Sequence, residues 1–342
     1  TTPCGSRSVP MLRTQATAER IHPRMELSLH QSAINLALHA VTLRENAGPM
    51  NASTTSLEPA TRDWKRPLRY VVRVPLLLLH LCIGQPIVLM ALLPPIAPMR
   101  IASGERIDHR MIRWWQGGLM RVFGFRLKRV GEPRREATLF VANHCSWLDI
   151  SLLHSQRAVC FVAKSEIAHW PVIGWLASRG GTIYHERGSN DSLTRVSQTM
   201  VERLQSGLGV GVFPEGGTGG GYKVRTFHAR IFQTCYDANV PAQPVALRYV
   251  RGGHAAKAVA FRGKEAFFPN VLRLLGEPAT IAEVHFLDPV PLATEGGRKR
   301  MAEAARRAII VALGFESPPP LRAKSVDATD DLDPIAEADV PV

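Results

Sequence analysis

The sequence predicts an α/β fold in which a mixed sheet is flanked by helices and preceded by an N-terminal apolar helical segment. From Ala137 onward, short apolar runs alternate with amphipathic stretches, the pattern that strands and their connecting helices produce. The most apolar stretch lies ahead of that region, at 74–99, with basic residues on both sides. Because 45% of the 342 residues are hydrophobic, the chain can bury a core of this kind.

The ends of the chain differ from this central part. The first residues show no clear periodicity, and Met25 and Met50 are candidate start sites, so this region is a candidate upstream extension. The last residues are proline-rich and then acidic, which is typical of disorder. We therefore predict a poorly ordered region at 1–61, basic and apolar membrane-associating helices at 62–130, an α/β domain at 131–317 and an acidic disordered tail at 318–342.

The charge narrows the choice of partners. A formal net charge of +13 calls for nucleic acid, an anionic membrane, an acidic protein or a phosphorylated substrate. No zinc-finger, RNA-recognition or helix-turn-helix pattern accompanies it, so we expect no nucleic acid partner. The five cysteines form no CxxC pair, and we expect no metal. A membrane-bound scaffold or a basic nucleic-acid-binding protein is the non-enzymatic alternative.

The apolar segment at 74–99 is long enough to cross a membrane. As one helix it would measure ~39 Å, against a hydrocarbon core of ~30 Å. Pro86, Pro94 and Pro95 are expected to interrupt it, which is more typical of a re-entrant or interfacial segment. Trp114 and Trp115 predict a second, interfacial helix. Basic residues on both flanks place entry and exit on the cytoplasmic face, unless the segment is a soluble core helix with a basic edge.

The α/β region contains six predicted strands and five predicted helices. Apolar runs predict strands at 137–142, 158–163, 182–185, 210–213, 244–250 and 282–287. Helical patterns fall near 148–155, 171–179, 191–206, 226–238 and 296–313. This alternation is typical of α/β architecture.

The stretch "NHCSWLD" at 143–149 joins the first of these strands to the first helix. Ser146 and Asp149 have the spacing of a helix capping box, which needs no chemistry. Within one regular helix, His144 and Asp149 would lie ~140° apart and could not meet. If Ser146 is the N-cap, His144 can fold back over the first turn, where Asp149 sits. Asp149 then accepts the Nδ1 proton and leaves Nε2 of His144 free as a general base.

The neighbouring Cys145 raises a rival mechanism with a thiol nucleophile. Adjacent residues in an extended chain point to opposite faces, so sequence neighbours rarely form a nucleophile and base pair. We therefore expect no catalytic role for this thiol.

Three further stretches end predicted strands, where α/β folds place ligands. They are "GTIYHER" at 181–187, "FPEGGT" at 213–218 and "VPAQPVAL" at 240–247. Arg187 is a candidate clamp for a phosphate or carboxylate, although a solvated surface arginine is commoner. Glu215 stands among glycines whose backbone can approach a ligand, although such a loop is often only flexible.

Together the four stretches resemble the glycerolipid acyltransferase family, whose best-known bacterial members are 1-acyl-glycerol-3-phosphate acyltransferases. Its NHxSxxD motif implies His144 as base and Asp149 as its orienting partner. Its second motif implies Arg187 for the acceptor headgroup, and its fourth matches Val240, Pro241, Pro244 and Val245. The resemblance implies that the substrate-binding residues are Asn143, Ser146, Arg187, Glu215, Gly216 and Thr218.

The third motif departs from the family pattern. It usually reads FPEGTR, but Gly217 and Thr218 replace the threonine and arginine here. One expected anion contact is therefore missing, although Lys223 or Arg225 can substitute for it. The departure bears directly on the headgroup that the acceptor carries.

The resemblance implies transfer of a fatty acyl group from a thioester to the hydroxyl of a lysolipid, namely 1-acyl-glycerol-3-phosphate, giving phosphatidic acid in phospholipid biosynthesis. The alternative acceptor is lyso-ornithine lipid, whose acyltransferases resemble "ANHCSWLDI" and "FVAKSEIAHWP". No cofactor is expected beyond the co-substrate, acyl-CoA or an acidic acyl carrier protein thioester. We expect the enzyme on an anionic membrane surface, at the cytoplasmic face of a bacterial inner membrane. The sequence leaves the oligomeric state open.

Overall fold

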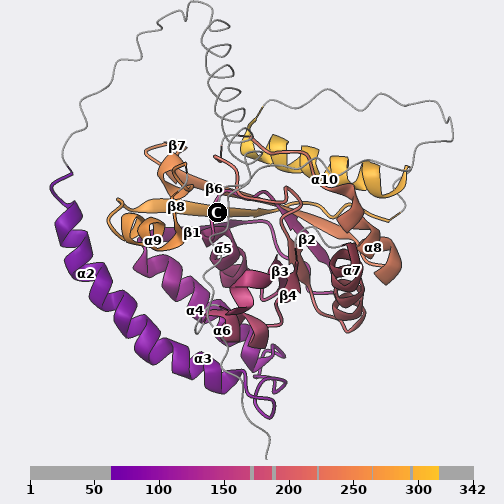
Figure 1. Ribbon diagram of the computed structural model, residues 1–342, viewed down its shortest axis with the longest axis horizontal. Helices are drawn as coiled ribbons and strands as arrows, with labels where there is room; N and C mark the ends of the chain where they lie inside the picture. The colour runs from indigo at the N-terminus through magenta and orange to yellow at the C-terminus, as the bar shows by residue number, and fades with distance from the viewer. Residues whose placement is uncertain are drawn as a thin grey trace, which may run out of the picture. The chain divides into compact units, whose positions relative to one another are not determined.

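The computed structural model describes residues 63–169, 173–186, 190–221, 223–263, 265–292 and 296–315. The predicted region 1–61 and the predicted tail 318–342 lie outside them. Within the described residues the strands form one eight-stranded sheet in the order β1-β8-β6-β2-β5-β3-β4, with β7 paired to β6 (Figure 1). The predicted α/β class with a mixed sheet is confirmed.

The strands of this sheet are β1 Phe125–Val130, β2 Leu139–Ala142, β3 Cys160–Lys164, β4 Ile183–His185, β5 Val210–Val212, β6 Ala242–Arg251, β7 His254–Ala255 and β8 Thr280–Phe286. From β4 through β3, β5 and β2 to β6, each strand runs parallel to the next. The sheet is mixed because β8 runs antiparallel to β6 and carries the parallel edge strand β1.

Helices cover both faces of the sheet. The α-helices are α2 Arg66–Leu79, α3 Gln85–Ala91, α4 Ile107–Val122, α5 Leu148–Gln156, α6 Ile173–Arg179, α7 Asn190–Gln205, α8 Gln233–Ala238, α9 Phe267–Leu275 and α10 Gly297–Leu313. Along β2, Leu139 and Val141 belong to the core under α7, α8 and α10, whereas Phe140 and Ala142 belong to the core under α4, α5 and α9. This alternation is the two-residue period of a strand buried on both sides.

The six predicted strands are all present, with small differences at their ends. The structure also contains β1, β7 and α9, which the sequence patterns do not predict. Strand β1 occupies the end of the segment predicted as membrane-associating helices, 62–130. Its sequence, FRLKRV, buries only Phe125, so the apolar alternation is too short and too basic to be recognised. The predicted helix at 226–238 is a 3-10 turn, Ala229–Phe232, followed by α8.

The apolar segment forms one continuous helix, Arg66–Ala91, the only helix in the described part that is long and apolar enough to cross a membrane. The expectation that Pro86 interrupts it is wrong. A π-helical turn, His80–Gly84, directly precedes the proline. The wider turn accommodates a ring that would otherwise clash with the carbonyl four residues earlier. The helix ends at Ala91, shortly before Pro94.

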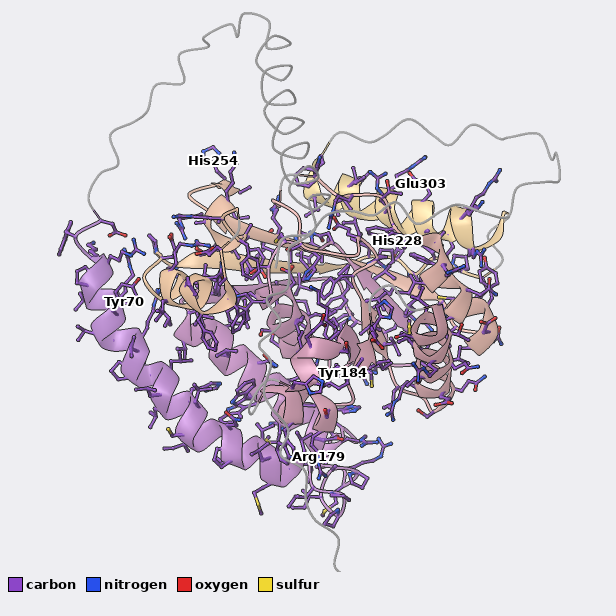
Figure 2. The ribbon with its side chains drawn as sticks, viewed as in Figure 1. Tyr70, Arg179, Tyr184, His228, His254 and Glu303 are labelled. Carbon is purple, nitrogen blue, oxygen red and sulfur yellow. The ribbon has the colours of Figure 1, made fainter. Side chains whose placement is uncertain are left out.

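This long helix is attached to the rest of the protein by side-chain hydrogen bonds. Arg69 donates a 2.8 Å hydrogen bond to the Gly276 carbonyl, and Arg73 donates to Leu275 and Glu277 at 3.0 and 2.7 Å. These carbonyls lie at the C-terminal end of α9, where cations are favoured. Tyr70, labelled on α2 in Figure 2, packs against the same core. Further along, Nε2 of His80 lies 3.0 Å from the Trp115 carbonyl of α4.

The rest of the helix surface is apolar and exposed. The exposed side chains are Leu68, Val71, Val72, Leu76, Leu78, Leu79, Ile83, Ile87 and Met90. Contiguous apolar surface of this extent is typical of a membrane or protein contact.

Candidate active site

The candidate active site lies at the carboxyl ends of β2 and β5, which are adjacent and parallel. Strand β2 leads into His144, and β5 leads into Phe213 and Glu215. Ligands of α/β sheets bind at such an edge. The sheet therefore brings "NHCSWLD" and "FPEGGT" together, although they are about 70 residues apart in the chain.

His144 and Asp149 are in direct contact. Nδ1 of His144 lies 2.8 Å from Oδ2 of Asp149, and that oxygen also accepts the backbone N–H groups of Cys145 at 2.7 Å and Ser146 at 2.8 Å. The other oxygen accepts the Tyr249 hydroxyl at 2.8 Å. Asp149 is fully buried, and these donors replace its hydration. The contact places the His144 proton on Nδ1, while Nε2 has no partner among the described residues.

The start of α5 differs from the expected capping box. Ser146 was expected as the N-cap, but α5 begins at Leu148, with Trp147 at the N-cap. The Asp149 carboxylate does reach back to the Ser146 N–H, as a capping box requires. The Ser146 hydroxyl, however, accepts from Leu148 at 3.4 Å, while the Asp149 N–H binds the Ser146 carbonyl at 3.0 Å. Only the half of the capping box that Asp149 supplies is formed. Its carboxylate accepts the N–H groups of Cys145 and Ser146 as well as binding His144.

Asn143 joins the end of β2 to β6. Its amide donates to the Leu247 carbonyl at 3.0 Å and accepts the Leu247 N–H at 2.8 Å. The last paired residue of β2 is Ala142, opposite Val245. The Asn143 side chain thus continues the strand pairing by one step, and its contacts are with the protein itself. Ser146 is likewise fully buried.

Glu215 clamps together the loops that follow β2 and β5. One carboxylate oxygen accepts the backbone N–H of His144 at 2.9 Å, and the other accepts that of Arg225 at 3.0 Å. The Arg225 guanidinium lies 3.6 Å from the same carboxylate and also binds the Gly217 carbonyl. Burial raises the pKa of Glu215, against the hydrogen bonds that lower it. The sequence predicted a ligand contact for Glu215; the carboxylate here binds backbone groups of its own chain.

The imidazole ring of His144 lies flat on the ring of Phe213. Their centroids are 4.0 Å apart, and the planes differ by 14°. In the sequence, Phe213 is notable only as the first residue of "FPEGGT". Neither its contact with His144 nor that of Tyr249 with Asp149 has a local sequence signal, because both depend on the order of strands.

The Cys145 thiol is not poised for attack. It is buried, and its sulfur lies 3.7 Å from Oδ1 of Asp149. Burial and the adjacent carboxylate raise the pKa of this thiol well above its ordinary value. A thiolate is therefore disfavoured at this position.

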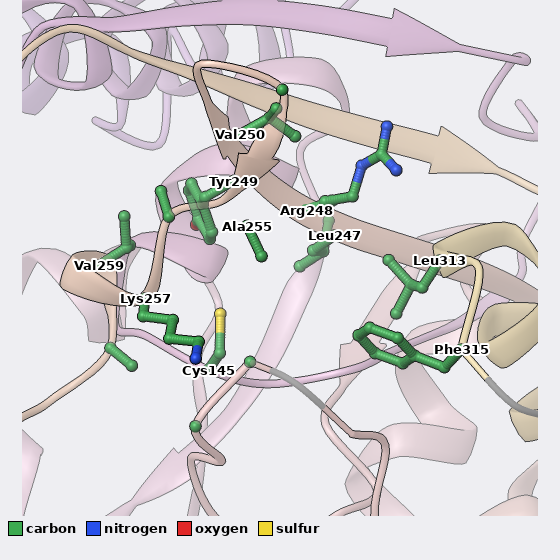
Figure 3. A pocket seen from close by; sticks show the side chains of 15 residues that line it. Cys145, Leu247, Arg248, Tyr249, Val250, Ala255, Lys257, Val259, Leu313 and Phe315 are labelled. Carbon is green, nitrogen blue, oxygen red and sulfur yellow. The ribbon is translucent and has the colours of Figure 1, made fainter. Parts of the chain in front are cut away.

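A cavity of about 180 Å³ adjoins the site. Figure 3 shows Cys145, Leu247 and Tyr249 around it, with Leu313 and Phe315 on the side of α10. Gly220 and Gly221, which continue the loop after "FPEGGT", also line it. The lining side chains are largely apolar, which suits a hydrocarbon chain or a neutral ligand.

The remaining predicted substrate-binding residues are less informative. Arg187 follows β4 but lies outside the described residues. Thr218 and Gly216 are exposed in the loop after β5. Gly216 has a φ of +72°, and a Cβ there would lie 2.9 Å from the His228 ring, so a larger residue would not fit. Of the two cations considered as substitutes for the missing arginine, Arg225 is engaged with Glu215, and Lys223 is exposed.

A histidine held through Nδ1 and open at Nε2 has the geometry that general-base catalysis requires. A family model described as Acyltransferase matches residues 126–248. The chain is 36% identical over 208 residues to the lyso-ornithine lipid O-acyltransferase of Pseudomonas aeruginosa. The aligned region covers 60% of this chain and 80% of that protein. The chain belongs to the acyltransferase family.

A further relative agrees with this assignment, and a solved structure shares the fold. The chain is 38% identical over 123 residues to the 1-acyl-sn-glycerol-3-phosphate acyltransferase of Neisseria gonorrhoeae, which covers 35% of this chain and 48% of that protein. The fold resembles the crystal structure of the 1-acyl-sn-glycerophosphate acyltransferase PlsC of Thermotoga maritima, with a TM-score of 0.54, 19% identity and coverage of 74% of this chain and 98% of that one. The predicted family and enzyme class are confirmed.

Proposed function

We propose that the enzyme transfers a fatty acyl group from a thioester to the free hydroxyl of a lysolipid. The contact between His144 and Asp149 carries the proposal. Nε2 of His144 accepts the hydroxyl proton while the oxygen attacks the thioester carbonyl. The ester C–O bond forms, the C–S bond breaks, and the imidazolium returns its proton to the leaving thiolate. No acyl-enzyme intermediate is needed.

The acceptor that we favour is lyso-ornithine lipid. Similarity to the Pseudomonas aeruginosa protein extends over 80% of its length, against 48% for the Neisseria gonorrhoeae protein. The loop after β5 also lacks the arginine of the FPEGTR pattern, and Arg225 is engaged with Glu215. An acceptor without a phosphate tolerates that loss. The second candidate is 1-acyl-glycerol-3-phosphate, and 38% identity over 123 residues to the Neisseria gonorrhoeae protein supports it.

The donor is a soluble fatty acyl thioester, either acyl-CoA or an acyl carrier protein. The formal net charge of +13 favours the acidic carrier protein, because opposite charges speed and orient encounter. The reaction as proposed needs no metal and no further cofactor.

We also propose that the enzyme works at the cytoplasmic face of the membrane. The exposed apolar side chains of α2 and α3 supply the contact, together with Trp114 of α4, which is 49% exposed. Because Arg69, Arg73 and His80 bind α9 and α4, the helix lies along the enzyme. This attachment favours insertion into one leaflet over a complete crossing.

The decisive experiment offers each lysolipid to purified enzyme with acyl-CoA and with acyl carrier protein thioester, and identifies the products by mass spectrometry. The proposal expects a diacylated lipid from at least one pairing and none from His144→Ala. A folded enzyme that acylates neither lysolipid, or a His144→Ala variant that keeps full activity, contradicts the proposal.

A further inference from the structure

A column of four aromatic rings runs from His144 into the core. Behind Phe213 lies Phe161 of β3, with centroids 5.4 Å apart and planes within 10°. Behind Phe161 lies His154 of α5, at 4.9 Å and 20°. The loops after β2 and β5, one strand and one helix thus contribute one ring each. Four nearly parallel rings in succession fix the plane in which the His144 imidazole lies.

We propose that Phe213 is a positioning residue that holds the His144 imidazole in its reactive plane and favours its protonated form during acyl transfer. The proposal rests on the proposed function, because it assigns a role in the proton transfer at Nε2. The hydrogen bond from Nδ1 to Asp149 fixes one edge of the imidazole but permits rotation about that bond. The flat contact with Phe213 removes this rotation.

The second part of the proposal concerns charge. The face of a benzene ring carries negative electrostatic potential and attracts a cation within ~6 Å of its centroid, more strongly when water is excluded. His144 is neutral before the reaction and cationic after it accepts the hydroxyl proton. Phe213 therefore stabilises the transition state more than the ground state, and only such differential stabilisation raises kcat.

The base of the column carries no competing charge. His154 is buried, and burial together with the neighbouring His109 lowers its pKa to about 4, so the ring is neutral at physiological pH. Its Nδ1 has no hydrogen-bond partner among the described residues. His154 therefore contributes the flat face of its ring, and not a hydrogen bond from Nδ1, which agrees with a stacking role.

Other titratable groups also face His144. Asp149 from α5 binds its Nδ1, and Glu215 binds its backbone N–H. Cys145 and Tyr249 contact Asp149, and Arg225 forms an ion pair with Glu215, so these three groups act on His144 only indirectly. A change at Phe213 leaves each of these groups in place, so its effect on the pH profile can be separated from theirs.

The test replaces Phe213 by leucine and by a series of fluorinated phenylalanines, which weaken the potential of the ring face with little change in shape. We expect kcat of Phe213→Leu to fall ~3- to 30-fold with little change in KM for the lysolipid. The midpoint of the acidic limb of the kcat/KM profile should move down by ~0.5 to 1 pH unit. Each added fluorine should move this midpoint further, and Phe213→Trp should restore it.

The matched control is Phe227→Leu. Phe227 also lies beside another ring, Phe232, at 6.5 Å and 23°, but it is buried in the core on the other face of the sheet. We expect it to lower stability without moving the midpoint. The role of Phe213 is overturned if fluorination leaves the midpoint of the acidic limb unchanged. It is also overturned if Phe227→Leu moves that midpoint by the same amount. Full activity of His144→Ala would instead overturn the proposed function.

Discussion

Tyr249 donates a 2.8 Å hydrogen bond to Oδ1 of Asp149, although the two residues stand 100 positions apart in the chain. Asp149 is thus held at both oxygens, by His144 and two N–H groups at one and by Tyr249 at the other. Burial and the adjacent carboxylate raise the pKa of Tyr249 well above 10. The phenol is therefore a permanent donor, and it keeps the carboxylate turned toward the imidazole.

Replacing Tyr249 by phenylalanine tests this restraint. We expect Tyr249→Phe to reduce the free energy of unfolding by ~1.5–3 kcal/mol, the usual contribution of a hydrogen bond to a charged group, and to lower kcat as well. Urea unfolding and steady-state kinetics measure the two effects. Tyr236→Phe is the control, because the Tyr236 hydroxyl has no partner among the described residues. Equal losses in both variants would argue against a specific role of Tyr249.

Replacing each member of the proposed catalytic pair, His144 and Asp149, separates an effect on the reaction from an effect on helix capping. His144→Ala should abolish turnover and leave the fold intact, because the ring is partly exposed. Asp149→Ala should lower kcat by ~10²- to 10⁴-fold, because the base loses its orientation, and should also destabilise the start of α5. If Asp149 were only a helix cap, stability would fall by ~0.5–2 kcal/mol while the rate per folded molecule stayed unchanged.

Glu215→Gln should weaken the clamp between the catalytic loops. A glutamine amide presents a donor where the carboxylate accepts backbone N–H groups from His144 and Arg225. We expect a loss of ~1–3 kcal/mol in the free energy of unfolding, from one unsatisfied buried N–H, and a lower kcat. Glu132→Gln provides the comparison, because the Glu132 side chain forms only an exposed ion pair with Arg129 in the part of the chain that the structure describes. A stable Glu215→Gln variant with wild-type kcat would contradict the clamp.

The ion pairs of Glu283 lead to a prediction about how the free energy of unfolding depends on pH. It lies on β8 and binds Lys128 of β1 and Arg248 of β6, the residues opposite it in the sheet. Burial alone would raise its pKa, but hydrogen bonds from Lys128, Arg248 and His285 lower it to about 2. Its folded pKa lies below the ordinary value of ~4.3, so its contribution to stability is present above that pH and declines as the pH falls toward 2.

The measurement is the free energy of unfolding in urea between pH 7 and pH 2.5. Glu283→Gln should be less stable than the wild type at neutral pH and should lose less stability on acidification. Glu132→Gln should follow the wild-type curve. Parallel curves for wild type and Glu283→Gln would show that another carboxylate dominates the acid response.

The apolar face of the long helix predicts where the enzyme meets lipid. Leu79 and Ile83 are both 55% exposed. The double variant Leu79→Glu, Ile83→Glu should bind vesicles that contain anionic lipid at least ~10-fold more weakly, because the gain of ~1.5–3 kcal/mol per buried side chain is lost. Val311→Glu on α10 is the control, since Val311 is 62% exposed but lies outside the apolar face. Flotation of vesicles measures binding, and equal flotation of the two variants would exclude this face as the contact.

The sequence predicted what depends on local spacing. His144 and Asp149 were identified because five residues, one strand end and one helix start determine their contact. Phe213 and Tyr249 reach the site only through the order of strands, which no short stretch of sequence encodes. The sequence also indicates that Glu215 belongs to the site. Whether its carboxylate binds a ligand or two backbone N–H groups depends on how closely the loops after β2 and β5 approach each other.

Two errors in the helical part have a common cause. Pro86 was expected to break the helix, and α9 was missed because its start, "FFPN", resembles a turn. In both cases tertiary contacts outweigh local preference. Arg69 and Arg73 bind the end of α9, and His80, the first residue of the π-helical turn that accommodates Pro86, contacts the Trp115 carbonyl of α4.

The hydrogen bonds between α2 and the end of α9 also determine how the enzyme should be purified. The bonds of Arg69 and Arg73 end on backbone carbonyls and leave the apolar face untouched, so a detergent can coat that face without prying the helix loose. A protein shortened to begin after Arg73 would instead strip the cover from the end of α9. Mild extraction of a chain that retains the whole helix is therefore the sounder route to active material than trimming it toward solubility.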